Sequence, residues 1–177
     1  RLFKEKGYEN VTIEDITSAC RIAKGTFYNY FPRKESILLH LGLSQMAVLK
    51  ESIARHSKAK DFKESLKSIF KDLMLRNEQD PSLFKAVTIE VIRSPLLEDE
   101  LQLIEEFKLI LVPYLETALN KKQIAQKWAP QQIASILVGM YFYTILTSLT
   151  DPKANPMLAQ FYTYLDMLWP GIEGEGV

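Results

Sequence analysis

The sequence has little of the chemistry on which secreted proteins and metalloenzymes depend. Its 177 residues include one cysteine and two histidines. The single cysteine, Cys20, excludes a disulfide within the chain and favours a reducing, cytoplasmic environment. His40 and His56 stand sixteen residues apart with no further metal ligand in an obvious constellation. This spacing argues against a metal site.

Catalytic and nucleotide-binding motifs are also missing. The chain has no P-loop, no GxSxG motif and no glycine-rich dinucleotide fingerprint. Cys20 falls on the inner face of a predicted helix, where a buried and inert thiol is expected. The acidic residues at 98–100 and 105–106 fit the solvated face of a helix. We therefore predict that the protein is not an enzyme and has neither metal nor cofactor.

Long hydrophobic runs and strand alternation are absent as well. Apolar residues make up 47% of the chain, but the richest stretch, 133–149, is interrupted by Ser135, Thr144, Thr147 and Ser148. A membrane span requires about 18 apolar residues in succession, so this stretch predicts a buried helix. No signal peptide is recognisable. The expectation is a soluble, cytoplasmic, all-α protein with no membrane partner.

The chain has no excess charge of either sign. Lysine and arginine together number 22, as do aspartate and glutamate. Residues 1–40 contain seven basic and five acidic side chains, which leaves a small positive balance at the N-terminus. Overall charge therefore does not indicate nucleic-acid binding, although a local basic face is sufficient for contact with phosphates.

Helical periodicity runs through almost the whole sequence and predicts about nine helices. Thr12 to Asp15 forms a variant of the capping box, and Gly7 stands where a helix would end. Pro32 is expected in the first turn of the long fourth helix. The predicted helices are 1–6, 13–20, 23–30, 32–55, 61–77, 80–92, 97–120, 130–149 and a last one ending near Trp169-Pro170.

Three segments are predicted from this order. Residues 1–40 form a three-helix head, whose first helix is expected to be truncated because the sequence begins inside it. Residues 41–170 form a helical body. Residues 171–177 form a flexible, glycine-rich tail.

Two short helices joined by a tight break, 13–20 and 23–30, are typical of a helix-turn-helix. A small core of Ile13, Ile16, Cys20, Ile22 and Phe27 would hold them together. The other face of the second helix carries Lys24, Thr26, Tyr28, Asn29 and Tyr30. Gly25 inside this helix costs about 1 kcal/mol relative to alanine, which suits a close approach of the backbone to DNA. The alternative is that the tyrosines only cover the junction with the next helix.

This stretch resembles the N-terminal domain of the TetR/AcrR family of regulators. The resemblance rests on Lys24-Gly25-Thr26-Phe27-Tyr28, followed by Phe31 and Lys34-Glu35, and covers about residues 1–45. Arg21 departs from the family, which usually has glycine in the turn. It either strains the turn or adds a phosphate contact.

The resemblance implies a set of DNA-binding residues. Thr12, Tyr28, Tyr30 and Lys34 would contact phosphates, Lys24 a base edge or phosphate, and Asn29 an adenine. Main-chain and hydroxyl contacts would come from the start of the recognition helix. The complete set is Thr12, Ala23, Lys24, Gly25, Thr26, Tyr28, Asn29, Tyr30 and Lys34.

The resemblance also implies a dimer built from the last two helices and a ligand pocket within the body. The dimer residues would be Leu137, Met140, Leu158, Phe161, Tyr162 and Leu165, although the same residues would also suit a monomer core. The pocket would be lined by Phe70, Met74, Phe84, Phe107, Tyr114, Tyr141 and Tyr143, although aromatic residues and methionine at helical spacing are more often core residues than ligand contacts.

Together these features predict a ligand-responsive transcriptional regulator. We expect a repressor that a small apolar or aromatic molecule releases from a palindromic operator. Its partners would be double-stranded DNA, a second copy of the chain and an unidentified small molecule. The alternative is an all-helical module that binds a protein through the same head and has no affinity for DNA.

Overall fold

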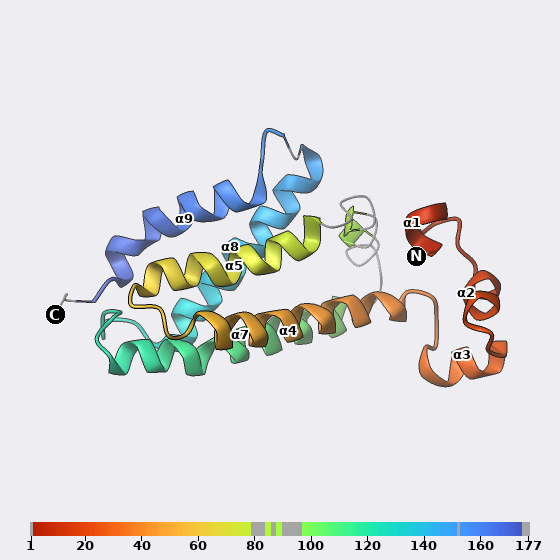
Figure 1. Cartoon of the computed structure of the whole chain (residues 1–177), viewed down its shortest axis with the longest axis horizontal. Helices are drawn as coiled ribbons and strands as arrows, with labels where there is room; N and C mark the ends of the chain where they lie inside the picture. Colours follow the sequence, from red (N-terminus) through yellow and green to blue (C-terminus); the bar gives the residue numbers. More distant parts are fainter. Residues whose placement is uncertain (1, 79–83, 86–87, 90–96, 152, 175–177) are drawn as a thin grey trace. The chain divides into compact units, whose positions relative to one another are not determined.

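The protein is all-helical in the part of the chain that the structure describes. This computed structural model describes residues 2–78, 84–85, 88–89, 97–151 and 153–174. The helices are fewer than the nine predicted, because most of the expected helix at 80–92 lies outside the described residues (Figure 1). They are α1 (Leu2–Lys6), α2 (Ile13–Cys20), α3 (Lys24–Tyr30), α4 (Ser36–His56), α5 (Phe62–Glu78), α7 (Leu97–Asn120), α8 (Pro130–Thr150) and α9 (Met157–Ile172).

Most helix bounds agree with the periodicity, but the start of α4 does not. The predicted bounds coincide with those of α2 and α7. Pro32 is not in the first turn of α4, which begins four residues later at Ser36. Phe31, which precedes the proline, is extended, as steric contact with a proline ring demands. A turn over residues 33–35 then leads into the helix.

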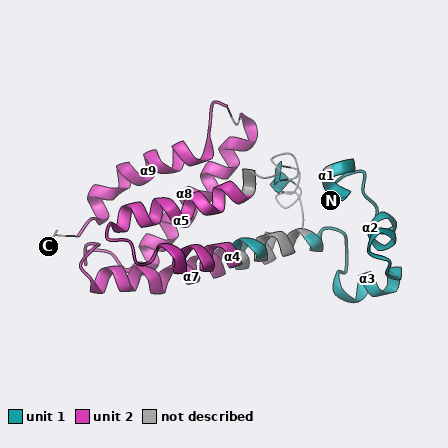
Figure 2. Cartoon of the chain, in the orientation of Figure 1, with its two compact units in different colours: residues 1–45, 77–103 teal, residues 46–76, 104–177 magenta. Residues whose placement is uncertain are grey.

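The chain forms two compact units (Figure 2). The first comprises Arg1–Gln45 and Asn77–Leu103 and contains the α1–α3 head. The second comprises Met46–Arg76 and Ile104–Val177 and contains α8, α9 and all of α5 except its last two residues. The helices α4 and α7 each contribute residues to both units. A boundary near residue 40, as proposed from the sequence, would fall inside α4.

A few side chains hold the head together. Tyr8, Val11 and Phe27 are buried, and the Phe27 ring lies 5.5 Å from that of Phe31. The prediction that Cys20 and Ile22 belong to this core is wrong, because Cys20 is exposed and Ile22 is 40% exposed. Ile13 and Ile16 are half-buried.

The core of the body is aromatic and spans four helices. Phe70 of α5 stacks on Phe161 of α9 at 4.3 Å between ring centres. Phe107 of α7 stacks on Tyr141 of α8 at 5.5 Å, nearly parallel. All four side chains are buried, so each helix is fixed by contacts with its neighbours.

On length and composition alone, α8 is able to cross a membrane, contrary to the expectation from the sequence. Its mean hydropathy reaches 1.6 over an 18-residue window, because the serine and threonine residues only weakly reduce it. The core helix of a soluble protein satisfies the same test. One face of α8, including Leu137, Tyr141 and Ile145, is buried inside the body. We therefore assign α8 to the core.

The C-terminal residues to Gly174 are not a free tail. The helix α9 continues through Pro170 to Ile172, whose side chain is buried. The Ile172 carbonyl accepts a hydrogen bond from the Ala125 amide at 2.9 Å, and Ile124 pairs with Glu173 in an isolated bridge. The expectation of a flexible segment from residue 171 onward is wrong for residues 171–174.

Candidate functional site: a helix-turn-helix head and a body cleft

The first helix of the motif, α2, begins with a complete capping box. The amide of Asp15 donates to Thr12 Oγ1 at 3.1 Å, and the amide of Thr12 donates to Asp15 Oδ2 at 2.9 Å. Lys6 Nζ donates to the other carboxylate oxygen at 2.6 Å. The hydrogen bond from Lys6, followed by those from Thr12, lowers the pKa of Asp15 well below its usual range. The start of α2 therefore depends on a charged carboxylate at neutral pH.

The turn between α2 and α3 has the geometry that usually requires glycine. Arg21 has φ 54° and ψ 43°, in the left-handed region. Its amide donates to the Ser18 carbonyl at 3.2 Å, and the Ile22 amide donates to the Thr17 carbonyl at 3.0 Å. These two bonds close the end of α2 in the pattern of a Schellman motif. Arg21 therefore occupies the glycine conformation at a steric cost and keeps the turn tight.

The second helix, α3, directs almost all of its side chains outward. Phe27 is 2% exposed and is the only buried residue of the helix. Tyr28 is 46% exposed and Tyr30 is 76% exposed. Lys24, Thr26 and Asn29 are exposed as well. One aromatic anchor thus holds a short polar helix with its recognition face free, and the tyrosines do not bury themselves in a junction.

Nothing within the folded head requires glycine at position 25. A Cβ atom built on it meets no other atom within 4 Å, and its backbone is in an ordinary helical conformation. Glycine destabilises a helix interior, so some other requirement must offset this cost. Close approach of the α3 backbone to another molecule is such a requirement.

Lys24, at the start of α3, is paired with an acid that the sequence analysis overlooked. Its ammonium group donates to the carboxylate of Glu14 on α2. This hydrogen bond lowers the pKa of Glu14 and raises the pKa of Lys24. Both side chains are more than half exposed, so the pair contributes little to stability. Glu14 is ten residues before Lys24, and nothing in the spacing indicates that α2 and α3 bring the two side chains together.

Lys34 lies between the end of α3 and the start of α4 and reaches back to the first loop of the head. Its Nζ donates to the main-chain oxygens of Tyr8 at 3.1 Å and Val11 at 3.2 Å. The same nitrogen lies 4.3 Å from the centre of the Tyr8 ring. Tyr8 Oη in turn lies 3.4 Å from Glu35. Two of the three Lys34 protons are therefore committed inside the head, and one is left to reach outward.

The predicted DNA-binding residues fall into two sets by position. Ala23, Gly25, Thr26, Tyr28, Asn29 and Tyr30 lie together on the outward surface of α3 and its first flanking residue. The other three have internal partners: Thr12 the capping box, Lys24 the Glu14 carboxylate, and Lys34 two carbonyl groups. Their contact with DNA remains a prediction, whereas their place in the head is defined.

The predicted pocket residues lie in different places within the part of the chain that the structure describes. Phe70, Met74, Phe107 and Tyr141 are buried in the core. Tyr143 is exposed, with its ring 5.9 Å from that of Tyr164. Phe84 is half-buried, and its chain neighbourhood is mostly outside the described residues. Of this set, Tyr114 alone lines the cleft described next. The buried members of the set pack in the core, as aromatic residues at helical spacing usually do.

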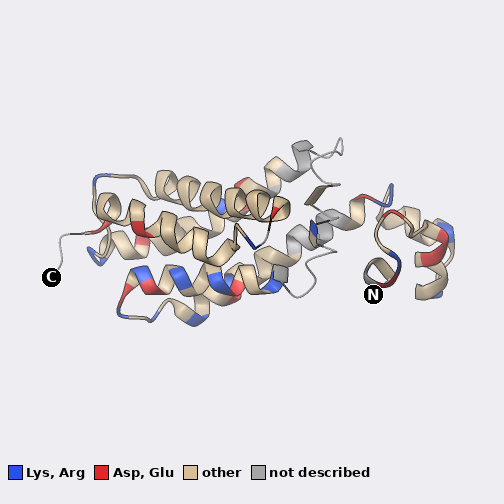
Figure 3. Ribbon diagram, turned by 90° about the horizontal axis from the view of Figure 1, so that it is seen from above, with Lys and Arg blue, Asp and Glu red and all other residues tan. Residues whose placement is uncertain are grey.

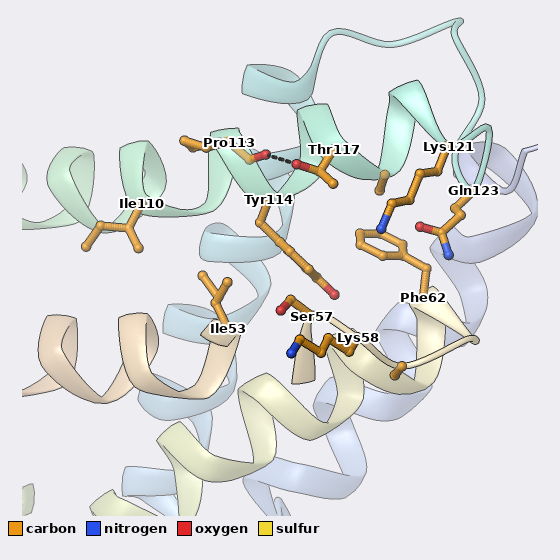
Figure 4. Close-up of a pocket in the computed structure, with 12 residues that line it drawn as sticks. Ile53, Ser57, Lys58, Phe62, Ile110, Pro113, Tyr114, Thr117, Lys121 and Gln123 are labelled. Carbon is orange, nitrogen blue, oxygen red and sulfur yellow. Dashed lines mark hydrogen bonds between the residues drawn. The ribbon is translucent and has the colours of Figure 1, made fainter. Parts of the chain in front are cut away.

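That cleft lies between the end of α4, the start of α5 and the second half of α7, and has a volume of about 450 Å³ (Figure 4). Phe62 and Tyr114 form one wall, with ring centres 5.0 Å apart. The residues lining it are Ile53, Ser57, Lys58, Ala59, Phe62, Ile110, Pro113, Tyr114, Thr117, Ala118, Lys121 and Gln123. The volume falls within the range of small-molecule sites. The sequence analysis missed it because its walls are far apart in the chain.

The predicted dimer residues are mostly inside one copy of the chain. Leu137, Phe161 and Leu165 are fully buried, and Tyr162 Oη donates to the Lys67 carbonyl at 3.4 Å. Met140 and Leu158 are half-buried. A fully buried side chain has no surface left for a second chain, so these three positions are corrected to core. The apolar side chains left exposed on the same two helices are Ile136, Tyr143, Leu146 and Met167.

A capped helix, a tight turn and a short outward-facing helix define this chain as a helix-turn-helix DNA-binding protein. The family model described as "Bacterial regulatory proteins, tetR family" matches residues 1–41. Residues 1–41 therefore form a DNA-binding domain of the TetR type.

Relatives and solved structures agree with this assignment. Residues of the head are 46% identical over 41 residues to the uncharacterized HTH-type transcriptional regulator YuxN of Bacillus subtilis, a match covering 23% of this chain and 14% of that protein. The HTH-type transcriptional repressor DhaR of Mycobacterium sp. is 25% identical over 98% of this chain and 89% of its own length. Thermus thermophilus FadR, a TetR-family repressor solved with lauroyl-CoA, has a TM-score of 0.80 at 21% identity, covering 99% of this chain and 92% of that one.

Proposed function

We propose that the protein is a ligand-responsive repressor that binds a palindromic operator through α3. The observation that carries the proposal is the outward face of α3, on which Phe27 alone is buried. Such a helix is too short to persist in water unless a packed neighbour supports it, as α2 does here. Asn29 lies on this face, and its side-chain amide matches the donor and acceptor groups of adenine in the major groove.

The experiment that tests this reading is selection of bound sequences from random duplex DNA. The wild-type chain should enrich a near-palindrome. Asn29→Ala should lose preference at one base pair of each half-site, by about 1–3 kcal/mol if the contact is bidentate. Gln126→Ala, which removes an exposed amide from the loop between α7 and α8, is the matched control and should keep the same preference. An Asn29 variant with unchanged preference would remove this residue from the reading face.

A second copy of the chain is proposed to pack against the exposed apolar face of α8 and α9. Ile136 and Tyr143 are seven residues apart, and Leu146 follows three later, so they share one side of α8. Tyr164 and the 75% exposed Met167 continue this face on α9. Figure 3 shows charged residues on the other body helices, whereas α8 has none. Sedimentation of a monomer at micromolar concentration would contradict the dimer.

Two heads in such a dimer would read half-sites about 34–36 Å apart, one helical turn of DNA. A ligand that prefers the state with misaligned heads would weaken DNA binding, and DNA would weaken ligand binding by the same factor. The repressor name of DhaR and the lauroyl-CoA bound to FadR support repression and ligand control. Function on operator DNA also leads us to expect a cytoplasmic protein.

The alternative, a protein-interaction module, makes a different prediction. A head that binds a protein neutralises no phosphates. It would therefore lack the affinity for duplex DNA that decreases steeply as the salt concentration rises. Fluorescence anisotropy with a labelled random duplex, measured from low to physiological salt, separates the two. A salt-independent or undetectable signal would favour the interaction module.

A further inference from the structure

We propose that the cleft between the end of α4 and the second half of α7 binds an amphipathic anion, a molecule with an apolar body and a carboxylate or phosphate head. The cleft belongs wholly to the second compact unit, and it differs in place from the aromatic core in which the sequence predicted a pocket.

The walls of the cleft are apolar. Ile53 of α4, Phe62 of α5 and Ile110 of α7 face it together with Pro113 and Ala118. Proline has no amide proton, so Pro113 leaves the carbonyl of Leu109 without its usual helical partner at this wall. At about 450 Å³, the space accommodates a short hydrocarbon chain or a ring system.

The rim is basic and contains no acid. Among the described residues, Lys58 and Lys121 are the only charged ones that line the cleft. Figure 4 shows their ammonium groups on opposite sides of the Tyr114 hydroxyl in that view. Both lysines are exposed, and neither forms an ion pair within the described part of the chain. Two unpaired cations beside an apolar wall favour a bound anion.

The neutral polar groups of the cleft have already used their hydroxyl protons. Tyr114 Oη donates to Ser65 Oγ at 2.6 Å, and Ser65 Oγ donates to the His56 carbonyl at 2.7 Å. Ser57 Oγ donates to the Ala54 carbonyl, and Thr117 Oγ1 donates to the Pro113 carbonyl. Burial raises the pKa of Tyr114, so this phenol keeps its proton. The lysine ammonium groups are therefore the strong donors left for a ligand.

The proposal deepens the proposed function, since a ligand held here would be the one that weakens operator binding. Binding to the cleft is nevertheless measurable without DNA. Isothermal titration calorimetry of the full chain would measure the affinities of three probes: octanoate, octyl phosphate and octanol. The two anions should bind, and octanol should bind about tenfold more weakly, because it offers no negative charge to the lysine ammonium groups. A preference between octanoate and octyl phosphate identifies the head group.

Two variants complete the test. Lys58→Gln/Lys121→Gln should reduce affinity for the anions to that for octanol and leave octanol binding unchanged. Thr117→Trp should fill the cleft from its rim and abolish binding of all three molecules. The control Lys71→Gln/Lys153→Gln changes two exposed lysines that do not line the cleft and should bind as the wild type does.

The proposal is overturned if none of the probes binds, if octanol binds as tightly as the anions, or if the double lysine variant retains anion affinity. A normal melting temperature for each variant, measured by circular dichroism, excludes misfolding as the cause. Failure of these titrations with operator binding intact would refute the cleft alone. Loss of operator binding with intact titrations would refute the proposed function alone.

Discussion

Lys34 Nζ donates to the main-chain oxygen of Tyr8 at 3.1 Å and also lies 4.3 Å from the centre of the Tyr8 ring. One ammonium group thereby ties the end of the recognition helix to the loop between α1 and α2. The family resemblance implies a phosphate contact for the same residue. The two roles are compatible, because two protons serve the carbonyls and the third is available for DNA.

Lys34→Met should show both roles. Removing the charge while keeping the aliphatic stem should destabilise the head by about 1–2 kcal/mol, because two carbonyls lose a charged donor. It should also lower affinity on all DNA sequences and reduce the salt slope by about 1. Hydrogen exchange over residues 8–34 and anisotropy at several salt concentrations measure the two effects. Lys50→Met, an exposed lysine on α4, is the control. An unchanged slope would leave Lys34 with a structural role only.

Glu14→Gln should strengthen DNA binding. The substitution frees the Lys24 ammonium and removes one negative charge from the surface that would face the phosphates. We expect roughly three- to tenfold tighter binding to random duplex at low salt and a steeper salt slope. The melting temperature should not change, because the ion pair is exposed. Glu51→Gln, exposed on α4, serves as the control. Weaker binding by Glu14→Gln would mean that Glu14 orients Lys24 for its contact.

Tyr30→Phe should weaken DNA binding without affecting folding. The side chain is 76% exposed, so loss of its hydroxyl removes no contact that stabilises the head. A phenol that donates to a phosphate oxygen contributes about 1 kcal/mol, equally on every sequence. Anisotropy on operator and random duplex measures the effect. Gln126→Ala, exposed in the loop between α7 and α8, should leave both affinities unchanged.

Acid should destabilise the body through Asp72. Partial burial works to raise the pKa of this carboxyl, but hydrogen bonds from Ser52 and His56, with the charge of Arg55, outweigh burial and lower the pKa below its ordinary value. A depressed pKa contributes stability above the unfolded-state value and loses it as pH falls through the folded-state value. Urea unfolding of Asp72→Asn should therefore show less loss of stability at acid pH than the wild type. An equal loss would assign acid sensitivity to other carboxyls.

The helices that the sequence predicted best are those with local signals. Thr12 and Asp15 lie three residues apart, so the capping box is readable without knowledge of the fold. The core of the head was less readable, because Cys20 continues the spacing of Ile13 and Ile16. The left-handed turn at Arg21 ends α2 at that point, and Tyr8 and Val11, from the loop before α2, are buried instead.

The faces of α8 and the position of the cleft were beyond prediction for a different reason. The helix α8 is apolar on nearly every side, so periodicity does not tell which residues pack inward. Tertiary contacts with α5, α7 and α9 decide that Leu137 is core and Ile136 is surface. The cleft likewise depends on Lys58 and Lys121 lying close in space although they are far apart in the chain.

Because the space around Gly25 is empty, the stability of the head and its binding to DNA favour different residues at this position. Alanine would fit the folded head and should make it more stable by about 1 kcal/mol, so selection for stability alone would replace the glycine. If the α3 backbone meets DNA closely, the same methyl group would obstruct the complex. A library of variants at this position, sorted once by cellular abundance and once by operator occupancy, should therefore rank alanine and glycine in opposite orders.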